Sequence, residues 1–213
     1  MPNKEDTEKA LEILEEDIER LGYDIEEEID EEIEGQEVRG FHCRREQFAF
    51  QVLTVIDENI PFFEVRYVFN AQQIIARELK RRNEAGEDEE IEFDPEEDED
   101  YIEEARKKLV GLTRREFRKI QKGLIERITS TDTFYKIATI DNYGIEAFQV
   151  QKRVFPLEDF YNISKLESAV RAVINKGDLG GIFLAHSYEL EDFFDEEFDG
   201  KEDKEESELG YIG

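Results

Sequence analysis

The chain holds few residues that could pair a catalytic nucleophile with a base. Its single cysteine, Cys43, directly follows His42, and the second histidine is His186. A nucleophile needs a base within hydrogen-bond reach. On a strand, His42 and Cys43 would point to opposite faces and could not form a dyad. We therefore expect a buried cysteine beside an exposed imidazole, and we assign no catalytic residue; a working carboxylate pair would not stand out among 57 acids.

A second candidate for chemistry is a calcium loop in the stretch DEEFDGKEDKEE, residues 195–206. Acids at loop positions 1, 3, 5, 9 and 12 surround a glycine at position 6, as in calcium-binding helix-loop-helix units. The candidate ligands are Asp195, Glu197, Asp199 and Glu206. The glutamate at position 3, the glutamate at position 8 and the short following SELGYIG depart from that pattern. The loop is a weak calcium candidate, and we assign no metal.

No glycine-rich phosphate loop is present in the sequence. The stretch GDLGG at 177–181 follows a helical pattern instead of preceding one. Its glycines are typical of a helix end and a turn. We therefore expect no cofactor.

A cluster of cations could form an electrostatic binding surface. It consists of Arg114, Arg115, Arg118, Lys119 and Lys122. These residues lie opposite an apolar stripe that includes Phe117, Ile120 and Leu124, as in an amphipathic helix. Three interpretations stay open: a nucleic-acid surface, a solvated helix face, or a face that the preceding acidic run covers.

Charge is strongly segregated along the 213 residues. The net charge is −29, yet residues 84–104 carry 14 acids and no base, whereas residues 105–188 carry 9 acids and 15 bases. Adaptation to high salt would spread carboxylates over the whole surface, so this clustering speaks against it. The total argues against nucleic acid and anionic membranes as partners, since both would be repelled.

The compartment expected from the sequence is the cytoplasm. No apolar run approaches the roughly 20 residues of a membrane span. The start MPNKEDTEKALEI has neither the basic nor the apolar part of a signal peptide. One cysteine cannot form an internal disulfide, which fits a reducing compartment.

The first half of the chain predicts a helix, strands and a second helix. Residues 6–22 repeat apolar side chains at helical spacing, and 23–37 form an edge strand or a loop. Between 38 and 69 apolar residues alternate, which indicates antiparallel strands with one buried face. The alternating residues are Phe48, Phe50, Val52, Thr54 and Ile56, then Phe63, Val65, Tyr67 and Phe69. Asn70 then caps a helix.

The second half repeats this order after an acidic interruption. We expect residues 84–104 to lack order, because the isolated apolar residues Ile91 and Phe93 do not offset the entropy of fixing the acidic run. A basic helix follows, then a hairpin with its turn at 141–144. A capping box at 164–167 opens a helix that Gly177 closes. GGIFLAHSY at 180–188 reads as a short last strand, and the acidic tail begins at 189.

This order predicts an α+β fold, an antiparallel sheet with helices on one side. One domain would contain residues 1–83 and 105–188, interrupted by the acidic insertion 84–104 and followed by the tail 189–213.

Residues 148–186, which contain a strand, the helix after it and the expected last strand, resemble the C-terminal part of an uncharacterised archaeal family of unknown function that has the fold of type III secretion chaperones. The resemblance rests on Phe148, Val150, Lys152, Arg153, Val154, Phe155, Leu166, Ala169, Val170, Val173, Leu179, Gly181, Ile182 and Leu184. Secretion chaperones are typically small, acidic, ATP-independent dimers that hold an extended peptide of another protein. The resemblance therefore implies a binding module, and it transfers no functional residue.

We expect a non-catalytic protein-binding or chaperone-like adaptor that forms a homodimer. Its partner would be another protein with an extended or basic segment, and the acidic insertion 84–104 and tail 189–213 would attract that segment. The alternative is an electrostatic regulator that binds nucleic acid or a basic nucleic-acid-binding protein. Salt dependence separates them, because apolar capture persists at high ionic strength and electrostatic docking fades.

Overall fold

The computed structural model describes residues 4–33, 36–45, 48–55, 62–84, 93–95, 97–140, 143–157 and 159–189. The chain divides into two compact units. The first comprises residues 1–69, 125–138 and 147–180, and the second comprises 70–124, 139–146 and 181–213.

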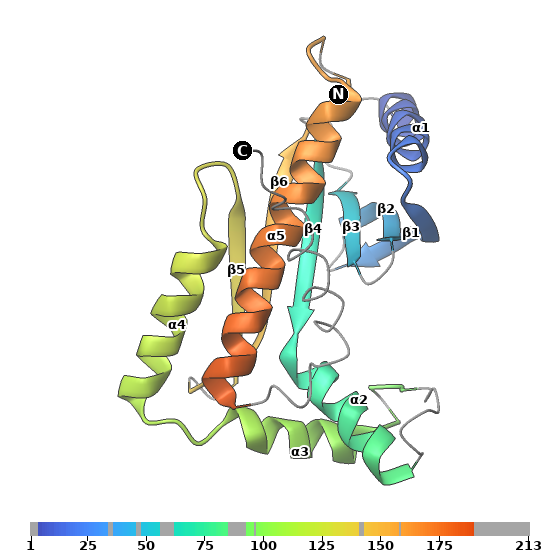
Figure 1. The fold of residues 1–213 in the computed structure, drawn as a ribbon. Coiled ribbons are helices and arrows are strands. Elements are labelled where there is room, and N and C mark those ends of the chain that lie inside the picture. The colour runs from blue at the N-terminus through green and yellow to red at the C-terminus, as the bar shows by residue number, and fades with distance from the viewer. Residues whose placement is uncertain are drawn as a thin grey trace, which may run out of the picture. The chain divides into compact units, whose positions relative to one another are not determined.

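The helices and strands follow the predicted α+β order, and that fold class is confirmed (Figure 1). The strands form one sheet in the order β1-β2-β3-β4-β6-β5. The elements are α1 (Lys4–Arg20), β1 (Asp24–Ile33), β2 (Gln36–Arg45), β3 (Phe48–Val55), β4 (Phe63–Asn70), α2 (Ala71–Glu84), α3 (Glu99–Leu109), α4 (Arg114–Ile128), β5 (Phe134–Ile140), β6 (Gly144–Val154) and α5 (Ile163–Tyr188).

In the first unit, the buried face of the sheet follows the predicted alternation. Pairing of β2 with β3 places Phe41 beside Val52 and Cys43 beside Phe50, and all four are buried. Thr54, Phe63, Val65 and Phe69 are buried as well, and Tyr67 is half-buried. The side chains of Phe48 and Ile56 lie outside the described residues. Period-two burial is what one covered sheet face requires.

Helix α1 and strand β1 show how the N-terminal pattern is used. Ala10, Leu14 and Ile18 lie at helical spacing and are fully buried. The Tyr161 hydroxyl donates a 2.9 Å hydrogen bond to the buried Asp17 carboxylate. Residues 24–33 form an edge strand, one of the two forms we predicted for them.

The predicted last strand is wrong, because α5 continues as one helix to Tyr188. Gly177 was expected to close this helix, yet it lies inside it. A Cβ atom at Gly177 would lie 2.2 Å from Cδ1 of Tyr67, and one at Gly180 would lie 2.6 Å from Cζ of Phe148. The glycines let the helix lie directly on the sheet. The packing outweighs their helix-breaking tendency of about 1 kcal/mol each.

Replacing Gly177 by alanine should therefore destabilise the protein despite alanine's better helix propensity. Overpacking costs about 1–3 kcal/mol and propensity returns about 1, so we expect a net loss of about 1 kcal/mol in urea unfolding. Adding Tyr67→Ala removes the ring that the new methyl group meets. The double variant should be more stable than the two single losses predict, and strict additivity would show that the two residues are not in contact.

The second unit contains a helix, α3, that the sequence did not separate from the basic helix after it. Helix α3 begins at Glu99, inside the stretch expected to lack order. The side chain of Gln72 on α2 donates to the carbonyl of Ile102 at 3.2 Å. Lys80 pairs with Asp98 at 2.8 Å. These contacts fix α3 beside α2 although its sequence is mostly polar. Residues 85–92 and 96 of the acidic run lie outside the described residues.

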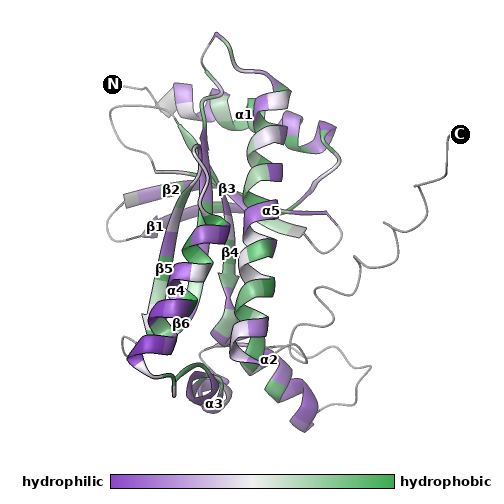
Figure 2. Ribbon diagram, turned by 60° about the vertical axis from the view of Figure 1, so that its left-hand side comes forward, coloured by the Kyte–Doolittle hydropathy of each residue, from purple (hydrophilic) through white to green (hydrophobic). Residues whose placement is uncertain are grey.

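Helix α4 is amphipathic, as predicted. Thr113 and Glu116 form a reciprocal cap, because each backbone N–H donates to the other's side chain, at 2.8 and 3.3 Å. Hydrophilic and hydrophobic residues alternate along the helix (Figure 2). No helix in the described parts of the chain is long and apolar enough to cross a membrane.

Candidate functional site

The two edges of the sheet differ sharply in charge. Strand β1 ends the sheet on one side, and seven of its ten residues are carboxylates. Strand β5 ends it on the other, and Lys136 is its only charged residue. An edge strand presents unpaired backbone groups that can pair with another chain, and charged side chains discourage such pairing. The β1 edge is therefore protected, whereas the β5 edge is not.

Two large aromatic side chains on β5 are exposed. The exposed fraction is 52% for Phe134 and 40% for Tyr135, and both residues belong to the first unit. Successive residues of a strand point to opposite faces, so each face of the strand presents one ring. An edge that offers both backbone groups and apolar side chains has the properties that bind an extended peptide.

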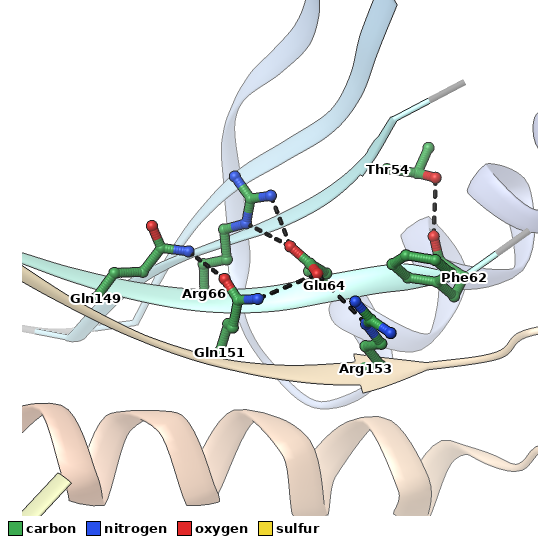
Figure 3. Close-up of polar contacts among 7 residues, drawn as sticks. All are labelled: Thr54, Phe62, Glu64, Arg66, Gln149, Gln151 and Arg153. Carbon is green, nitrogen blue, oxygen red and sulfur yellow. Dashed lines mark hydrogen bonds and ion pairs between the residues drawn. The ribbon is translucent and has the colours of Figure 1, made fainter. Parts of the chain in front are cut away.

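Beside this edge lies a polar group that we call the Glu64 cluster, drawn in Figure 3. Its members are Glu64 and Arg66 on β4 and Gln149, Gln151 and Arg153 on β6. Their side chains point away from α5, which runs along the other side of the strands (Figure 3). The cluster therefore marks the sheet face opposite the one that α5 covers.

The Glu64 carboxylate is the centre of the cluster. Arg66 contacts one oxygen through Nη2 at 2.6 Å and Nε at 3.1 Å. The other oxygen accepts a 3.1 Å hydrogen bond from Gln151 and lies 3.4 Å from Nε of Arg153. Gln149 donates to Gln151 at 2.6 Å. Glu64 and Gln151 are only 8% and 6% exposed, so these partners replace the water that the buried groups have lost.

Arg153 connects the cluster to the aromatic edge. Its guanidinium carbon lies 4.3 Å from the ring centre of Phe62 and 5.2 Å from that of Phe134. Each such cation–π contact contributes about 0.5–1 kcal/mol at an exposed site. Arg153 therefore favours this position of the Phe134 ring while 43% of its own side chain stays exposed. The edge thus presents an aromatic ring and a cation together.

The predicted cationic residues of α4 all lie on one exposed helix. Arg114, Arg115, Arg118, Lys119 and Lys122 are exposed, whereas Phe117, Ile120 and Leu124 are buried. Helix α4 as far as Leu124 belongs to the second unit. The structure thus brings the five cations together on the exposed side of α4.

The neighbouring His42 and Cys43 have separate surroundings. Cys43 is 1% exposed and faces Phe50, its partner on β3. His42 is half-buried, not exposed as we expected, and its Nε2 lies 3.2 Å from the Gln51 side chain. Burial, reinforced by the Glu26 carboxylate, raises the pKa of the Cys43 thiol to about 12. A thiol that stays protonated at neutral pH is a poor nucleophile.

Cys43 should accordingly resist alkylation in the folded protein. At pH 8 we expect iodoacetamide to label native protein at least about a hundredfold more slowly than urea-unfolded protein, whose thiol has an ordinary pKa of about 8.5. The pKa of the Cys43 thiol is higher in the folded than in the unfolded protein, so its titration also affects the free energy of unfolding. The contribution of the protonated thiol to stability is complete below pH 8.5 and is lost as the pH rises toward 12. Mass spectrometry measures the labelling rate. Equal rates for the native and the unfolded protein would show that the thiol is accessible.

The remaining sequence candidates concern metals and phosphate. The calcium-loop residues Asp195, Glu197, Asp199 and Glu206 lie outside the described residues. Within the described ranges, no group of three or more His, Cys, Asp and Glu side chains could hold a metal ion. The glycines at 177–181 lie within α5, not in the turn that we predicted.

Comparison with known proteins identifies the fold of this chain but no family. No protein-family model and no curated protein matches this sequence. The fold is that of an uncharacterised archaeal protein. A crystal structure from Methanothermobacter thermautotrophicus is similar with a TM-score of 0.55 and 8% identity, over 84% of this chain and 99% of that chain. The archaeal structure thus shares the arrangement of elements, and no residue role follows from it.

The Glu64 cluster was missed at the level of sequence, although a signal was present. The prediction used the apolar residues at every second position of the strands, such as Phe63 and Val65. It did not consider the polar residues at the positions between them. At those positions Glu64 and Arg66 alternate on one strand, and Gln149, Gln151 and Arg153 alternate on another. Long polar side chains at every second position of two strands indicate a polar face that can form a network.

Proposed function

We propose that this protein is a non-catalytic binding protein that holds an extended segment of another protein along the β5 edge. The observation that carries the proposal is the exposure of Phe134 and Tyr135 on an edge strand with a single charged residue. A bound strand would gain backbone hydrogen bonds from β5, and its side chains on the two faces of the sheet would pack against one ring each. This mode of binding also fits the chaperone-like role that the sequence resemblance implies.

The charge layout suggests the selectivity of such binding. The other edge, β1, carries a row of carboxylates and would repel a second strand unless that strand were basic. At the β5 edge, Arg153 and Lys136 would favour a segment with apolar residues and an occasional acid. The acidic runs would keep the complex in solution and steer basic parts of the same partner.

The test compares variants in affinity purification from the organism that encodes the protein. A Phe134→Asp/Tyr135→Asp variant places two charges on the edge, and Leu179→Asp places one at an equally exposed apolar position, 50% exposed, on α5. We expect a specific protein to remain bound to the wild type and to Leu179→Asp through a high-salt wash, and to be lost from the edge variant. A partner that the edge variant retains would contradict the proposal.

Self-association is a separate outcome of the same variants. We propose a homodimer whose interface lies away from β5, so the edge variant should keep the dimer mass in light scattering. Conversion of a wild-type dimer to a monomer by the two charges would show that the β5 edge pairs with a second copy, and the edge would then not be free for a partner.

A second candidate function is electrostatic regulation through α4, which the exposure of its five predicted cations favours. Reversing Arg115, Arg118 and Lys119 to glutamate would remove binding of nucleic acid or of another acidic partner to α4. Such binding weakens steeply with salt. A partner lost at high salt and lost with these α4 changes, but kept by the edge variant, would favour this function.

A further inference from the structure

An open pocket in the first unit adjoins the start of α5. Its volume is about 450 Å³, which is within the range of small-molecule sites. The residues lining it are Asp132, Lys152, Arg153, Val154, Phe155, Phe160, Tyr161, Lys165 and Ser168. They come from the end of β6, the loop that follows it, the first two turns of α5 and the segment before β5.

The pocket is cationic in a strongly acidic protein. Three of the described lining residues are cations and one is an acid. Lys152 pairs with Asp132, and Arg153 lies 3.4 Å from Glu64. Lys165 is exposed, and its ammonium makes no hydrogen bond or ion pair with any residue that the structure describes. One positive charge at the pocket is therefore uncompensated within the described chain.

The direction of α5 adds to this charge. The helix begins at Ile163 and is 26 residues long, so its N-terminal end carries partial positive charge beside Lys165. An anion in the pocket would meet the Lys165 ammonium and this helix end. The cavity and the cations, more than the helix end, define the site.

Apolar surface faces the same pocket. Phe160 is 68% exposed, and Phe155 also lines the wall. Next to Phe160, the Tyr161 hydroxyl is bound to Asp17 on α1 at 2.9 Å, which ties the loop to another element of the same unit. A phenyl ring held open to water on an anchored loop is a preformed wall for a flat apolar group.

We propose that this pocket binds a small organic anion, a phosphate or carboxylate attached to a flat apolar group. Lys165 holds the anionic group, and Phe160 packs against the apolar part. The inference does not depend on the peptide-binding proposal, because Phe134 and Tyr135 do not line the pocket.

Titration calorimetry of the full chain at low ionic strength tests the proposal with three probes. 1-Naphthyl phosphate and 1-naphthoate present the two anionic groups, and 1-naphthol presents the same rings without a full charge. We expect at least one of the anions to bind at least about tenfold more tightly than naphthol, since charge-assisted hydrogen bonds are the strong ones. The tighter of the two identifies the preferred anionic group.

Three variants locate the binding. Lys165→Gln should weaken the tighter anion about tenfold, and Phe160→Ala should weaken it about threefold or more. Lys176→Gln removes the same charge eleven residues further along α5 and should leave affinity unchanged. Circular dichroism checks that each variant is folded. Failure of both anions to bind, equal binding of naphthol, or an affinity that Lys165→Gln leaves unchanged would overturn the proposal.

Discussion

Replacing Gly40 by alanine is expected to lower the free energy of unfolding by about 3 kcal/mol or more. A Cβ atom at this position would lie 1.9 Å from the carbonyl oxygen of Val52 and 2.9 Å from Cα of Leu53. Both are backbone atoms of the paired strand β3, so no side-chain rotation can make room. The strands must separate locally, which disturbs the β2–β3 ladder and its buried residues. The usual cost of overpacking, about 1–3 kcal/mol, is therefore a lower limit for the loss in free energy of unfolding.

Urea unfolding followed by circular dichroism measures this loss. Ala49→Gly serves as the control, because Ala49 is exposed on β3 and lies in the same ladder. Removing its methyl group should cost no more than about 1 kcal/mol. If Gly40→Ala unfolds at the wild-type midpoint with an unchanged slope, β2 and β3 are not as close at this position as the structure places them.

Replacing Glu64 by glutamine is expected to cost about 2 kcal/mol. The change removes the charge that both Arg66 and Arg153 face, and it places an amide group beside the buried Gln151. Breaking a fully buried pair costs about 3–5 kcal/mol. The side chains of Arg66 and Arg153 are 21% and 43% exposed, so water partly compensates their charges and the expected loss is smaller.

Glu167→Gln provides a matched control for Glu64→Gln. Glu167 pairs with Arg171 at 2.7 Å, but the two side chains are 38% and 72% exposed. The pair joins neighbouring turns of one helix and contributes about 0.3–0.5 kcal/mol. Both variants lose one carboxylate charge, so their difference isolates the effect of burial. Equal midpoints would show that Glu64 is hydrated and that the cluster does not stabilise the sheet.

The elements were predictable where one periodicity dominated. Ala10, Leu14 and Ile18 on α1, and Phe50, Val52 and Val65 on the sheet, follow periods that the sequence displays. Gly177 was misread because its role depends on Tyr67, which is 110 residues away. A local pattern cannot distinguish a glycine that ends a helix from one that allows close contact with a distant ring.

The candidate site was less accessible to sequence reasoning than the fold. The exposure of Phe134 and Tyr135 depends on β5 being an edge, and strand order is a tertiary property. The position of α3 likewise depends on distant partners, since Gln72 contacts Ile102 across the acidic run. By contrast, the cationic face of α4 was predictable, because a single helical period defines it.

Hydrogen exchange is the most direct test of the central claim that the β5 edge binds an extended segment. The protein would be isolated with its retained partner, and amide exchange would be compared by mass spectrometry before and after the partner is removed. We predict that amides of residues 134–138 gain protection in the complex and that those of 114–122 do not change. Protection confined to 114–122, with no change at 134–138, would contradict the account and place binding on α4.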